Sequence, residues 1–580
     1  DLAPSAPVFL KARAIELSSK FFKSMSPELR NEFFKLFMST SVTGVPLPIR
    51  LYSTLAIARF IGMPADEPTK QQKHAIVQPF IRDIIVYSCE IMREASDDNV
   101  HIPLDTLAAL IHFRPDCINH IGKDIITLLL DLCAKFASDP SVPMDIVNVF
   151  QQMAKSRPNY EVLRDALVPQ LAQILSSTAV TTQQSFVQIL IDILTVILNN
   201  ATEQDVPMLL TYCFRPIVNL ILDNDDASLL NNASECLRSY IYVSGEQLIT
   251  FQYTLNENGQ TIQRAPLQYT FQVIAKLLHP ELPDDSSSGA GGLINALFTT
   301  VGSHLNSDVM ATIIKAAIHR LATTDKLFVI QCLIIVFAKL VHDHMDALLN
   351  LLSTYELSSN TAKLSSLLLL AQKWGENQSL FYGSYRLKVT TLALAKLLLS
   401  GDQRLAVNIQ LDSADTEQTY RTRSKGPIKK KDIMFPIQCF ILLIEGYFRA
   451  KEAREFEEKG GDLEDLLYGG SDDDDDDEDF DEDDEEDEGG DDDVGFVHTT
   501  QDELNYFQHL VSNAHVDDED EDDIEDVFEK RDPINRVNLE QELPTYIKQV
   551  IEKYPHILPV AEPFMSEKHK NFIKQLLASK

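Results

Sequence analysis

The strongest constraint on the fold is an apolar pattern that returns at intervals of 44, 46 and 47 residues. When the chain is aligned on Pro79, Lys123, Pro169 and Pro216, an apolar residue follows two, five and six positions later each time. The aligned positions hold Ile81, Ile84, Ile85, Ile125, Leu128, Leu129, Leu171, Ile174, Leu175, Val218, Ile221 and Leu222. Such spacings put apolar residues on one side of a helix. Proline opens three of the four aligned helices, where its missing N–H costs little.

A second apolar helix is expected between the anchors, for example at residues 104–113, 144–153 and 184–198. Units of two helices with this period are typical of HEAT and armadillo arrays. We therefore predict an all-α fold, a HEAT-repeat superhelical solenoid of antiparallel helix pairs with an inserted disordered acidic loop. Chance agreement among leucine-rich helices is the alternative, and the regular spacing argues against it.

Local signals agree with a helical chain. Ser26, Pro27 and Glu28 form a helix start, and Phe33, Phe34 and Phe37 would share one face of that helix. A second apolar stripe is formed by Val309, Ile313, Ile314, Ala317, Ile318 and Leu321. Strand alternation is scarce. Residues 248–255 and 261–264, on either side of Asn258-Gly259, fit either a small hairpin or a loop between helices.

Composition divides the chain into five predicted parts. The solenoid would occupy 1–411, a polar and basic connection 412–432, a helix of a C-terminal repeat 433–461, an acidic loop 462–498, and C-terminal HEAT repeats 499–580. Within the last part we expect helices at 501–513, 543–551 and 567–577. The basic cluster in the connection is a localisation signal, a partner for the acidic loop, or a solvated linker; it contains Lys425, Lys429, Lys430 and Lys431.

The acidic loop is the most distinctive segment of the chain. Residues 471–493 contain 19 acids in 23 positions and no Lys or Arg, and residues 517–526 contain nine acids in ten positions. Adjacent carboxylates repel one another and bury almost nothing apolar, so neither run can fold alone. The candidate cargo-binding residues of the loop are Asp472, Asp473, Asp474, Asp475, Asp476, Asp477, Glu478, Asp479, Asp481, Glu482, Asp483, Asp484, Glu485, Glu486, Asp487, Glu488, Asp491, Asp492 and Asp493. A secondary run contains Asp517, Asp518, Glu519, Asp520, Glu521, Asp522 and Asp523.

The acidity of the chain is local. The net charge is −36, and without the 28 carboxylates of the two runs it would be only −8. A mobile polyanion attracts and screens polycationic partners, whereas it repels nucleic acid and anionic membranes. The sequence therefore predicts a carrier or chaperone for very basic proteins, with no direct nucleic-acid binding. The alternative is that the acidic loop only keeps the protein soluble.

Other classes of function have little support. The chain contains no HExxH, GxSxG, GxGxxG or EF-hand pattern, so we expect no enzyme, cofactor or metal site. His342 and His344 point to different sides of a helix, and Trp374 is expected in a core or an interface. The seven cysteines form no CxxC pair, which indicates buried free thiols in a reducing compartment.

We expect a soluble intracellular protein. The longest apolar run, 327–338, is interrupted by Gln331 and is too short to span a bilayer, and no signal peptide is evident. The chain begins at Asp1 rather than Met, which is compatible with a piece of a longer protein.

A helical array with an acidic loop among its last repeats resembles the importin-beta (karyopherin-beta) superfamily, and within it the importin nine / karyopherin one-fourteen branch. The resemblance rests on the acidic run, on Asp532-Pro533-Ile534, and on the closing helix 539–547 with the sequence LEQELPTYI. Residues 12–21, ARAIELSSKF, are similar to a repeat from the middle of that branch. The chain would thus be a C-terminal half.

The resemblance implies a nuclear import receptor and chaperone that shuttles between cytoplasm and nucleus. Its cargo would be core histone dimers (histone 2A–2B), and further TATA-box-binding protein, actin and ribosomal proteins. Cargo would lie in the concave face, with residues 472–493 shielding its DNA-binding surface. Ran-GTP and nuclear pore proteins would be further partners, although the main Ran site of the family lies in N-terminal repeats that this chain lacks. The alternative is a helical-repeat scaffold subunit of an assembly complex, without Ran-dependent transport.

Overall fold

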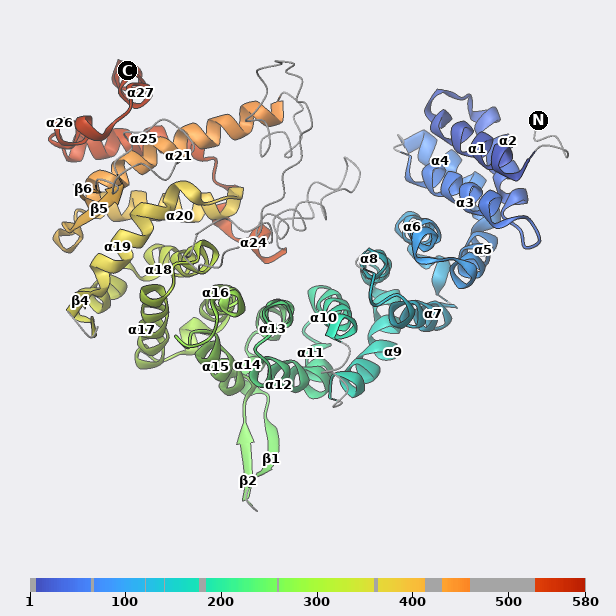
Figure 1. The fold of residues 1–580 in the computed structure, drawn as a ribbon, viewed down its shortest axis with the longest axis horizontal. Coiled ribbons are helices and arrows are strands. Elements are labelled where there is room, and N and C mark those ends of the chain that lie inside the picture. The colour runs from blue at the N-terminus through green and yellow to red at the C-terminus, as the bar shows by residue number, and fades with distance from the viewer. Residues whose placement is uncertain are drawn as a thin grey trace, which may run out of the picture. The chain divides into compact units, whose positions relative to one another are not determined.

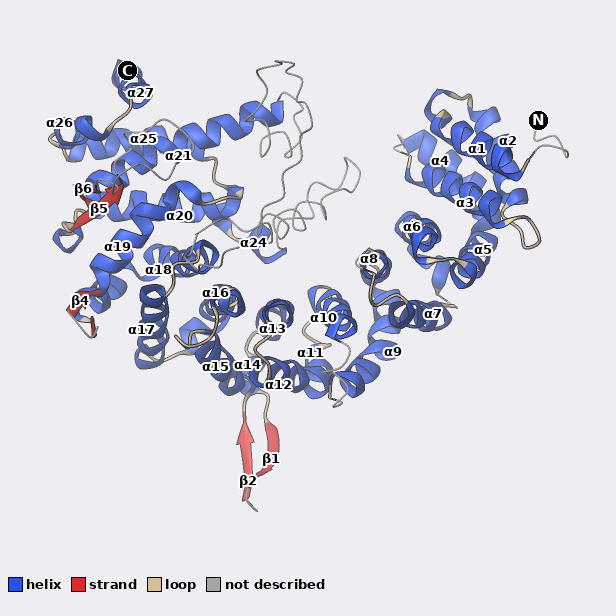
Figure 2. Ribbon diagram, viewed as in Figure 1, coloured by secondary structure: helices blue, strands red, loops and turns tan. Residues whose placement is uncertain are grey.

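The computed structural model describes residues 7–63, 67–119, 121–139, 141–176, 184–257, 260–358, 363–412, 430–458 and 527–578. Two compact units divide the chain, Asp1–Val336 (unit 1) and Phe337–Lys580 (unit 2). Both units are built mainly from α-helices (Figure 2).

Unit 1 contains two layers of helices, and successive helices of the first layer pack directly against one another (Figure 1). The first layer consists of α1 Val8–Lys20, α3 Leu47–Gly62, α6 Asp97–Phe113, α8 Val142–Ala154, α10 Gln184–Asn199, α13 Ala227–Ser244 and α16 Ala290–Val301. The second layer consists of α2 Pro27–Thr40, α5 Ile81–Glu94, α7 Gly122–Lys135, α9 Arg157–Leu175, α12 Arg215–Asp223, α15 Pro266–Leu277 and α17 Ser307–Thr323. Shorter helices fill the connections: α4 Glu67–Val77, α11 Val206–Leu209, α14 Gln247–Thr250, η1 Phe22–Ser24, η2 Gln78–Phe80, η3 Pro115–Ile118, η6 Asp284–Ser287 and η7 Gly302–His304.

The layers join as helix pairs, α5 with α6, α7 with α8, α9 with α10, α12 with α13, and α15 with α16. The four aligned sequence segments fall in α5, α7, α9 and α12, and the helices predicted between them are α6, α8 and α10. This confirms the predicted array of helix pairs. The apolar residues behind the alignment form the core between the layers: Ile84, Ile85, Ile125, Leu128, Leu129, Leu171, Leu175, Val218 and Ile221 are all buried.

Polar contacts between neighbouring pairs repeat at nearly the same interval. Arg157 Nη1 donates to Asp205 Oδ2 at 2.7 Å, 48 residues further on. Asn232 Nδ2 donates to Asp192 Oδ1 at 3.3 Å, and the two residues are 40 positions apart. Equivalent positions of adjacent repeats meet. The two residues of each such contact are therefore separated by about one repeat length.

The role predicted for proline is wrong at one of the three positions. Pro79 precedes α5 in η2, as expected. Pro216 lies in the first turn of α12, although this helix follows without a break from α11 and a π-helical turn, η5 Leu210–Phe214. Pro169, however, lies inside α9. Pro169 is exposed on its helix, where water can satisfy the carbonyl that the missing N–H leaves unbonded. In the π-turn before Pro216 the backbone hydrogen bonds span five residues instead of four. This pattern accommodates a proline, which has no N–H to bond the carbonyl four residues earlier.

Both local helix predictions are confirmed. Ser26 caps α2, since its Oγ accepts a hydrogen bond from Leu29 N at 3.3 Å, and Phe34 and Phe37 are fully buried. In α17 the predicted stripe faces the core at all positions except Val309, which is only half-buried.

The segment between α14 and α15 is a hairpin rather than an irregular loop. Strand β1 Tyr253–Glu257 pairs antiparallel with β2 Gln260–Arg264, and Leu255 lies opposite Ile262 (Figure 2). Its base is fixed by Tyr253, whose hydroxyl donates to Leu210 O at 2.7 Å in the π-helical turn. The carbonyl of Leu210 in that turn therefore finds a side-chain donor, as buried backbone groups require.

Unit 2 contains the rest of α18 Leu327–Thr354 together with α19 Ser366–Asn377, α20 Ser384–Ser400, α21 Phe435–Glu458, α25 Leu539–Lys553, α26 Ile557–Ala561 and α27 Glu567–Ala578. Its shorter elements are α24 Val527–Arg531, η8 Gln378–Leu380, η9 Gln403–Leu405, η10 Pro533–Arg536 and η11 Glu562–Phe564. Helix α21 is central, because α19, α20, α25 and α26 all pack against it. The helices predicted near residues 433–461, 543–551 and 567–577 are thus confirmed; the one predicted at 501–513 lies outside the described residues.

Two more hairpins in unit 2 were not predicted. One pairs β3 Glu356–Ser358 with β4 Lys363–Ser365, and the other pairs β5 Asn408–Asp412 with β6 Lys430–Met434. Strand β6 includes Lys430, Lys431 and Ile433, so α21 begins two residues later than expected. The paired strands of the second hairpin are too far apart in sequence for a turn signal to reveal them, and its strand β6 begins with three charged residues.

Helix α18 spans 28 residues, but its backbone leaves helical geometry at His344 (φ −140°, ψ 40°), so it consists of two helices joined by a kink. By length and composition both α18 and residues 206–223 could cross a membrane. However, 56% of the apolar window of α18 and 50% of that of 206–223 is buried inside the protein. Core helices of soluble proteins have the same properties, so the length of α18 alone does not indicate a membrane span.

Candidate functional site: the anchors of the acidic segment

The predicted cargo-binding residues, 472–493 and 517–523, all lie outside the described residues. The structure instead describes the two ends from which this segment leaves unit 2 and returns to it. These ends are α21 before the segment and α24, η10 and α25 after it, and they define the candidate site.

The first end is held by the buried half of α21. Phe440, Leu443 and Ile444 are fully buried, whereas the second half of the helix is charged. Near its end Arg454 makes a two-pronged contact with α25: Nε lies 2.6 Å from Glu540 Oε2 and Nη2 lies 3.0 Å from Glu540 Oε1. The hydrogen bond from Arg454 lowers the pKa of Glu540. Paired geometry of this kind gives orientation as well as attraction, so it orients the last part of α21 against α25.

The second end is held by Asp532. Its Oδ1 accepts a hydrogen bond from Ile534 N at 2.9 Å and caps η10, while its Oδ2 accepts hydrogen bonds from Lys339 Nζ at 2.8 Å and from the Tyr385 hydroxyl at 2.9 Å. Burial alone would raise the pKa of Asp532, but these donors outweigh burial and lower it. The carboxylate is therefore charged at neutral pH and ties η10 to α18 and α20.

Neighbouring contacts extend this attachment. Lys388 Nζ on α20 donates to Asn535 O at 2.6 Å, and Asn538 caps α25 by accepting a hydrogen bond from Gln541 N at 3.3 Å. From there Leu543 and Ile547 of α25 are fully buried, and α25 packs on α20 and α21. The Asp-Pro-Ile step and the closing helix that carried the family resemblance are thus the residues that attach the chain after the acidic segment.

The basic cluster of the 412–432 connection is only partly described. Lys431 lies on β6, where Nζ is 3.9 Å from the centre of the Phe564 ring and 3.4 Å from Pro563 O. This places Lys431 against η11, so part of the predicted cluster has a structural role within unit 2. Lys425 and Lys429 lie outside the described residues.

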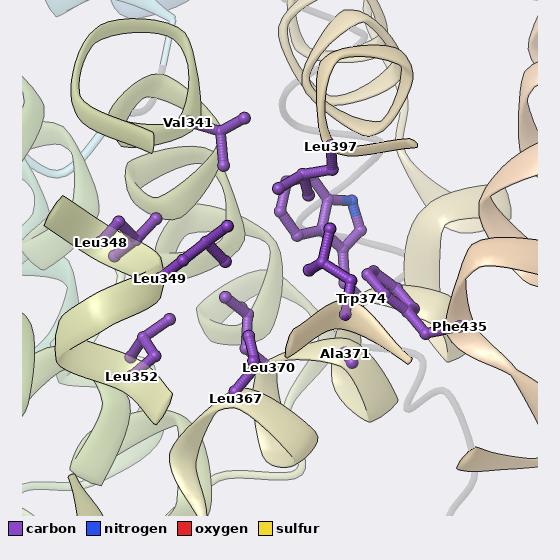
Figure 3. A pocket seen from close by; sticks show the side chains of 11 residues that line it. Val341, Leu348, Leu349, Leu352, Leu367, Leu370, Ala371, Trp374, Leu397 and Phe435 are labelled. Atoms are coloured by element: carbon purple, nitrogen blue, oxygen red, sulfur yellow. The ribbon is translucent and has the colours of Figure 1, made fainter. Parts of the chain in front are cut away.

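Trp374 belongs to the core, as one of the two readings of the sequence proposed. It is fully buried, and its Nε1 donates to Gln378 Oε1 at 2.7 Å. Around it Leu349, Leu370, Leu397 and other apolar side chains enclose a cavity of about 10 Å³ (Figure 3). A cavity of this size holds at most one water molecule, so it is a packing gap rather than a ligand site.

The cysteines also agree with the sequence. All seven are free, and Cys133, Cys213, Cys236 and Cys439 are buried. Burial raises the pKa of Cys133 and Cys213 to about 12, so these thiols are protonated and unreactive at neutral pH.

Comparison with known proteins places this architecture in a family. The family model described as "Importin-11-like, TPR repeats" matches residues 144–414. The protein named Importin-9 from Drosophila melanogaster is 29% identical over 378 residues, which cover 62% of this chain and 36% of that protein. The chain is similar to members of the importin-beta superfamily.

A second relative supports the same assignment. Importin subunit beta-5 from Schizosaccharomyces pombe is 22% identical over 437 residues, which cover 74% of this chain and 41% of that protein. The chain therefore spans about two fifths of the length of these importins. What an entire importin binds or transports is for that reason a separate question from the family of this chain.

A similar helical fold is also found among solved structures. The exportin Cse1 in its cargo-free, cytoplasmic state matches all of this chain with a TM-score of 0.51, and the match covers 50% of the exportin. Sequence identity is only 12%, so this likeness concerns the helical-repeat fold alone.

Sequence reasoning located the acidic runs but missed their attachment. Asp532-Pro533 is a recognisable helix-start signal, yet its partner Lys339 lies 193 residues earlier and Tyr385 lies 147 residues earlier. No local pattern marks Lys339, Tyr385 or Arg454 as partners, because each is one charged or polar residue on an ordinary helix.

Proposed function

We propose that this importin-beta superfamily chain is part of a nuclear import receptor that also chaperones basic cargo, chiefly core histone dimers. Similarity to importins supports transport, and the 28 carboxylates of residues 471–493 and 517–526 support cationic cargo. The observation that carries the proposal is the double attachment of this segment. Arg454–Glu540 and Lys339–Asp532 tether both ends to unit 2, which keeps its charge concentrated near the helices.

The physical role of the acidic segment is to neutralise surfaces of the cargo that the helices leave uncovered. Attraction between mobile charges reaches about one Debye length, roughly 8 Å at physiological salt, and weakens as salt increases. A histone dimer held by the repeats would therefore lose access to DNA while the segment covers its basic surface. Release in the nucleus would require a second partner, for which Ran-GTP is our candidate in the full-length receptor.

The test is a charge-neutral variant of equal length. All acids in residues 472–493 are replaced by their amides, and binding of the histone 2A–2B dimer is measured at 50, 150 and 300 mM salt. We expect affinity at 150 mM salt to fall about tenfold or more and its salt dependence to become shallower. Competition between this chain and a DNA duplex for the dimer should weaken in parallel.

The matched control neutralises exposed acids elsewhere, Asp124, Asp131 and Glu161 on the second layer of unit 1, and should change affinity less than twofold. If the neutral segment leaves both histone affinity and DNA competition unchanged, the proposed role of the acidic segment is wrong. A pull-down of the full-length protein with and without Ran-GTP then separates transport from scaffolding: release of cargo is expected of a shuttling receptor, and retention is expected of a scaffold.

A further inference from the structure

The connection between α13 and α15 in unit 1 is much longer than its counterparts. Residues 155–156 join α8 to α9 and residues 302–306 join α16 to α17, whereas residues 245–265 separate α13 from α15. Much of this extra length forms the hairpin of β1 and β2, which projects away from the helices of unit 1 (Figure 1). A short turn is enough to join two packed helices. The hairpin is therefore an addition to this repeat that the helical packing does not require.

The base of the hairpin is fixed by aromatic contacts. The Tyr253 hydroxyl donates to Leu210 O at 2.7 Å. The centre of the Tyr253 ring lies 5.1 Å from that of Phe251 and 5.8 Å from that of Tyr269. Phe214 stacks on the same ring at a centre-to-centre distance of 6.2 Å. These contacts set the direction in which the strands leave the helices, so a binding partner spends little free energy on ordering them.

Both outer edges of the hairpin are open. In the described part of unit 1, β1 and β2 form a sheet of two strands, and no third strand pairs with either of them. Glu257 pairs with Gln260, so two residues join the strands, and in such hairpins the pair next to the turn exchanges both of its hydrogen bonds. Alternation along the strands then identifies the residues whose backbone N–H and C=O groups point outward. These residues are Thr254 and Asn256 on β1, and Thr261 and Gln263 on β2.

The hairpin also lacks the features that usually protect an open edge. Proteins protect such edges with lysines, prolines, inward-facing charges or β-bulges, or cover them with a helix or loop. Here the pairing continues from Tyr253 to Glu257 without a bulge, and neither strand contains Lys or Pro. The charged residues of the two strands, Glu257 and Arg264, are each the last residue of their strand. The middle of each edge is thus a template for a further strand.

The side chains of the hairpin indicate which kind of strand would fit. Leu255 and Ile262 lie opposite each other and are half-buried, so one face is apolar. The other face carries the exposed residues Thr254, Asn256, Thr261 and Gln263. An added strand continues both faces, and its side chains would therefore alternate between apolar and polar. None of these hairpin side chains is charged, in a chain of net charge −36, so charge matching favours a neutral partner over basic cargo.

We propose that the β1–β2 hairpin binds an extended, uncharged segment of a partner protein, which pairs with one edge of the hairpin as a third strand. Main-chain hydrogen bonds provide the affinity in this mode of binding, and alternate side chains provide the specificity. The apolar side chains of the partner would lie beside Leu255 or Ile262. This interaction goes beyond the proposed cargo function, because it involves neither the acidic segment nor its attachment in unit 2.

The test begins with a phage-displayed library of random nine-residue peptides that contain no charged residue, selected on the full chain. We expect the enriched peptides to have apolar residues at alternate positions. The best of them is synthesised with a fluorescent label, and its binding is measured by anisotropy. Two N-methylated forms are compared with it, one methylated at odd and one at even positions. Only one form loses the donors that face the hairpin, so we expect one to bind about tenfold more weakly and the other to change less than twofold.

Proline variants locate the edge. Thr254→Pro removes an outward N–H from β1 and Gln263→Pro removes one from β2, while the hydrogen bonds between the two strands remain. We expect one of these variants to weaken peptide binding about tenfold. The matched controls, Thr254→Ala and Gln263→Ala, keep the N–H and should change affinity less than twofold. Circular dichroism and thermal unfolding establish that all four variants remain folded.

Three results would overturn the inference. The first is a set of enriched peptides that bind both proline variants as tightly as the unchanged chain. The second is equal binding of the two N-methylated forms. The third is a dimer of the unchanged chain that either proline variant converts to a monomer, because the edge would then be occupied by a second copy of the chain. Histone affinity should be the same in all four variants, so this inference and the proposed function fail independently.

Discussion

Unit 1 and unit 2 consist of similar helices, but their side-chain contacts bridge very different lengths of sequence. In unit 1 side-chain bonds between repeats, such as those of Asp192 with Asn232 and of Arg157 with Asp205, join residues 40 and 48 positions apart. In unit 2 the contacts that attach the acidic segment join residues 86 to 193 positions apart: Arg454 pairs with Glu540, and Tyr385 and Lys339 pair with Asp532.

This difference shows two ways to stabilise the same helical architecture. Each repeat of unit 1 is supported by its immediate neighbours, so stability is a sum of local interfaces. In unit 2 the helices before and after the long acidic insertion must be brought together. A few specific polar contacts offset the entropic cost of closing this large loop. Mutations should therefore lower the stability of unit 1 most at its buried polar networks, and that of unit 2 most at the residues that attach the acidic segment.

The largest effect is expected at Asp205, whose side chain is fully buried between two repeats of unit 1. It accepts hydrogen bonds from Arg157, from Arg164 and from Thr202 N at 2.8 Å. Asp205→Ala removes the buried acceptor that Arg157, Arg164 and Thr202 share, and we expect a loss of about 3–5 kcal/mol in the free energy of unfolding of unit 1. Denaturant unfolding followed by circular dichroism measures this loss.

Asp165 provides the control, because it also pairs with Arg164, at 2.7 Å, but is exposed. Asp165→Ala should cost less than about 1 kcal/mol. Similar losses in the two variants would show that burial between repeats adds nothing, and the contrast between the units would then lose its basis.

A smaller effect, with a characteristic pH dependence, is expected at Asp192. Burial raises the pKa of Asp192 to about 7. The folded protein therefore holds a proton that the unfolded chain releases near pH 4, so this residue makes stability fall as pH rises from about 4 to 7. Asp192→Asn removes that penalty, and we expect a gain of roughly 1–3 kcal/mol at pH 8 and almost none at pH 4.

Thermal unfolding of the two proteins across this pH range is the measurement. Asp124→Asn on α7, an exposed position, is the control and should be neutral at both pH values. A gain that is the same at pH 4 and pH 8 would show that desolvation of the carboxylate is not the cause.

The smallest effect on global stability is expected at the attachment in unit 2. Asp532→Asn weakens the bonds from Lys339 and Tyr385, and we expect a loss of about 1–2 kcal/mol. Hydrogen exchange should increase in residues 527–536 and remain unchanged in unit 1. The pKa of Asp532 is lowered in the folded state, so its contribution is complete at neutral pH and disappears as pH falls below about 4.

Lys339→Met should give the same local increase in exchange, and the double variant should add little, because both changes remove one interaction. Asp346→Asn, an exposed change on α18, serves as the control. Fully additive losses in the double variant would show that Lys339 and Asp532 act separately.

Much of unit 1 follows from the sequence because its signals are local. The Ser26 cap and the apolar stripe of α17 depend on residues three or four positions apart, which periodicity shows directly. The prediction for Pro169 failed for a physical reason: this proline is tolerated inside a helix at an exposed position, where the sequence pattern suggests a helix start. Whether proline breaks a helix depends on the surroundings of the carbonyl four residues earlier.

The candidate site was predictable in its charge but not in its attachment. Composition alone identifies the acidic runs, since no other part of the chain is as acidic as residues 471–493 and 517–526. The pairing of Arg454 with Glu540, and of β5 with β6, depends on which segments the fold brings together, and a single sequence contains no local trace of such contacts.

The long reach from Lys339 to Asp532 also has a consequence for biosynthesis. A ribosome that has just added Lys339 must add 193 more residues before the partner of that lysine exists. At about 5–20 residues per second this takes roughly 10–40 seconds. During that interval the repeats of unit 1 can already assemble one after another, while the nascent acidic stretch emerges from the exit tunnel ahead of the residues that will tie it down.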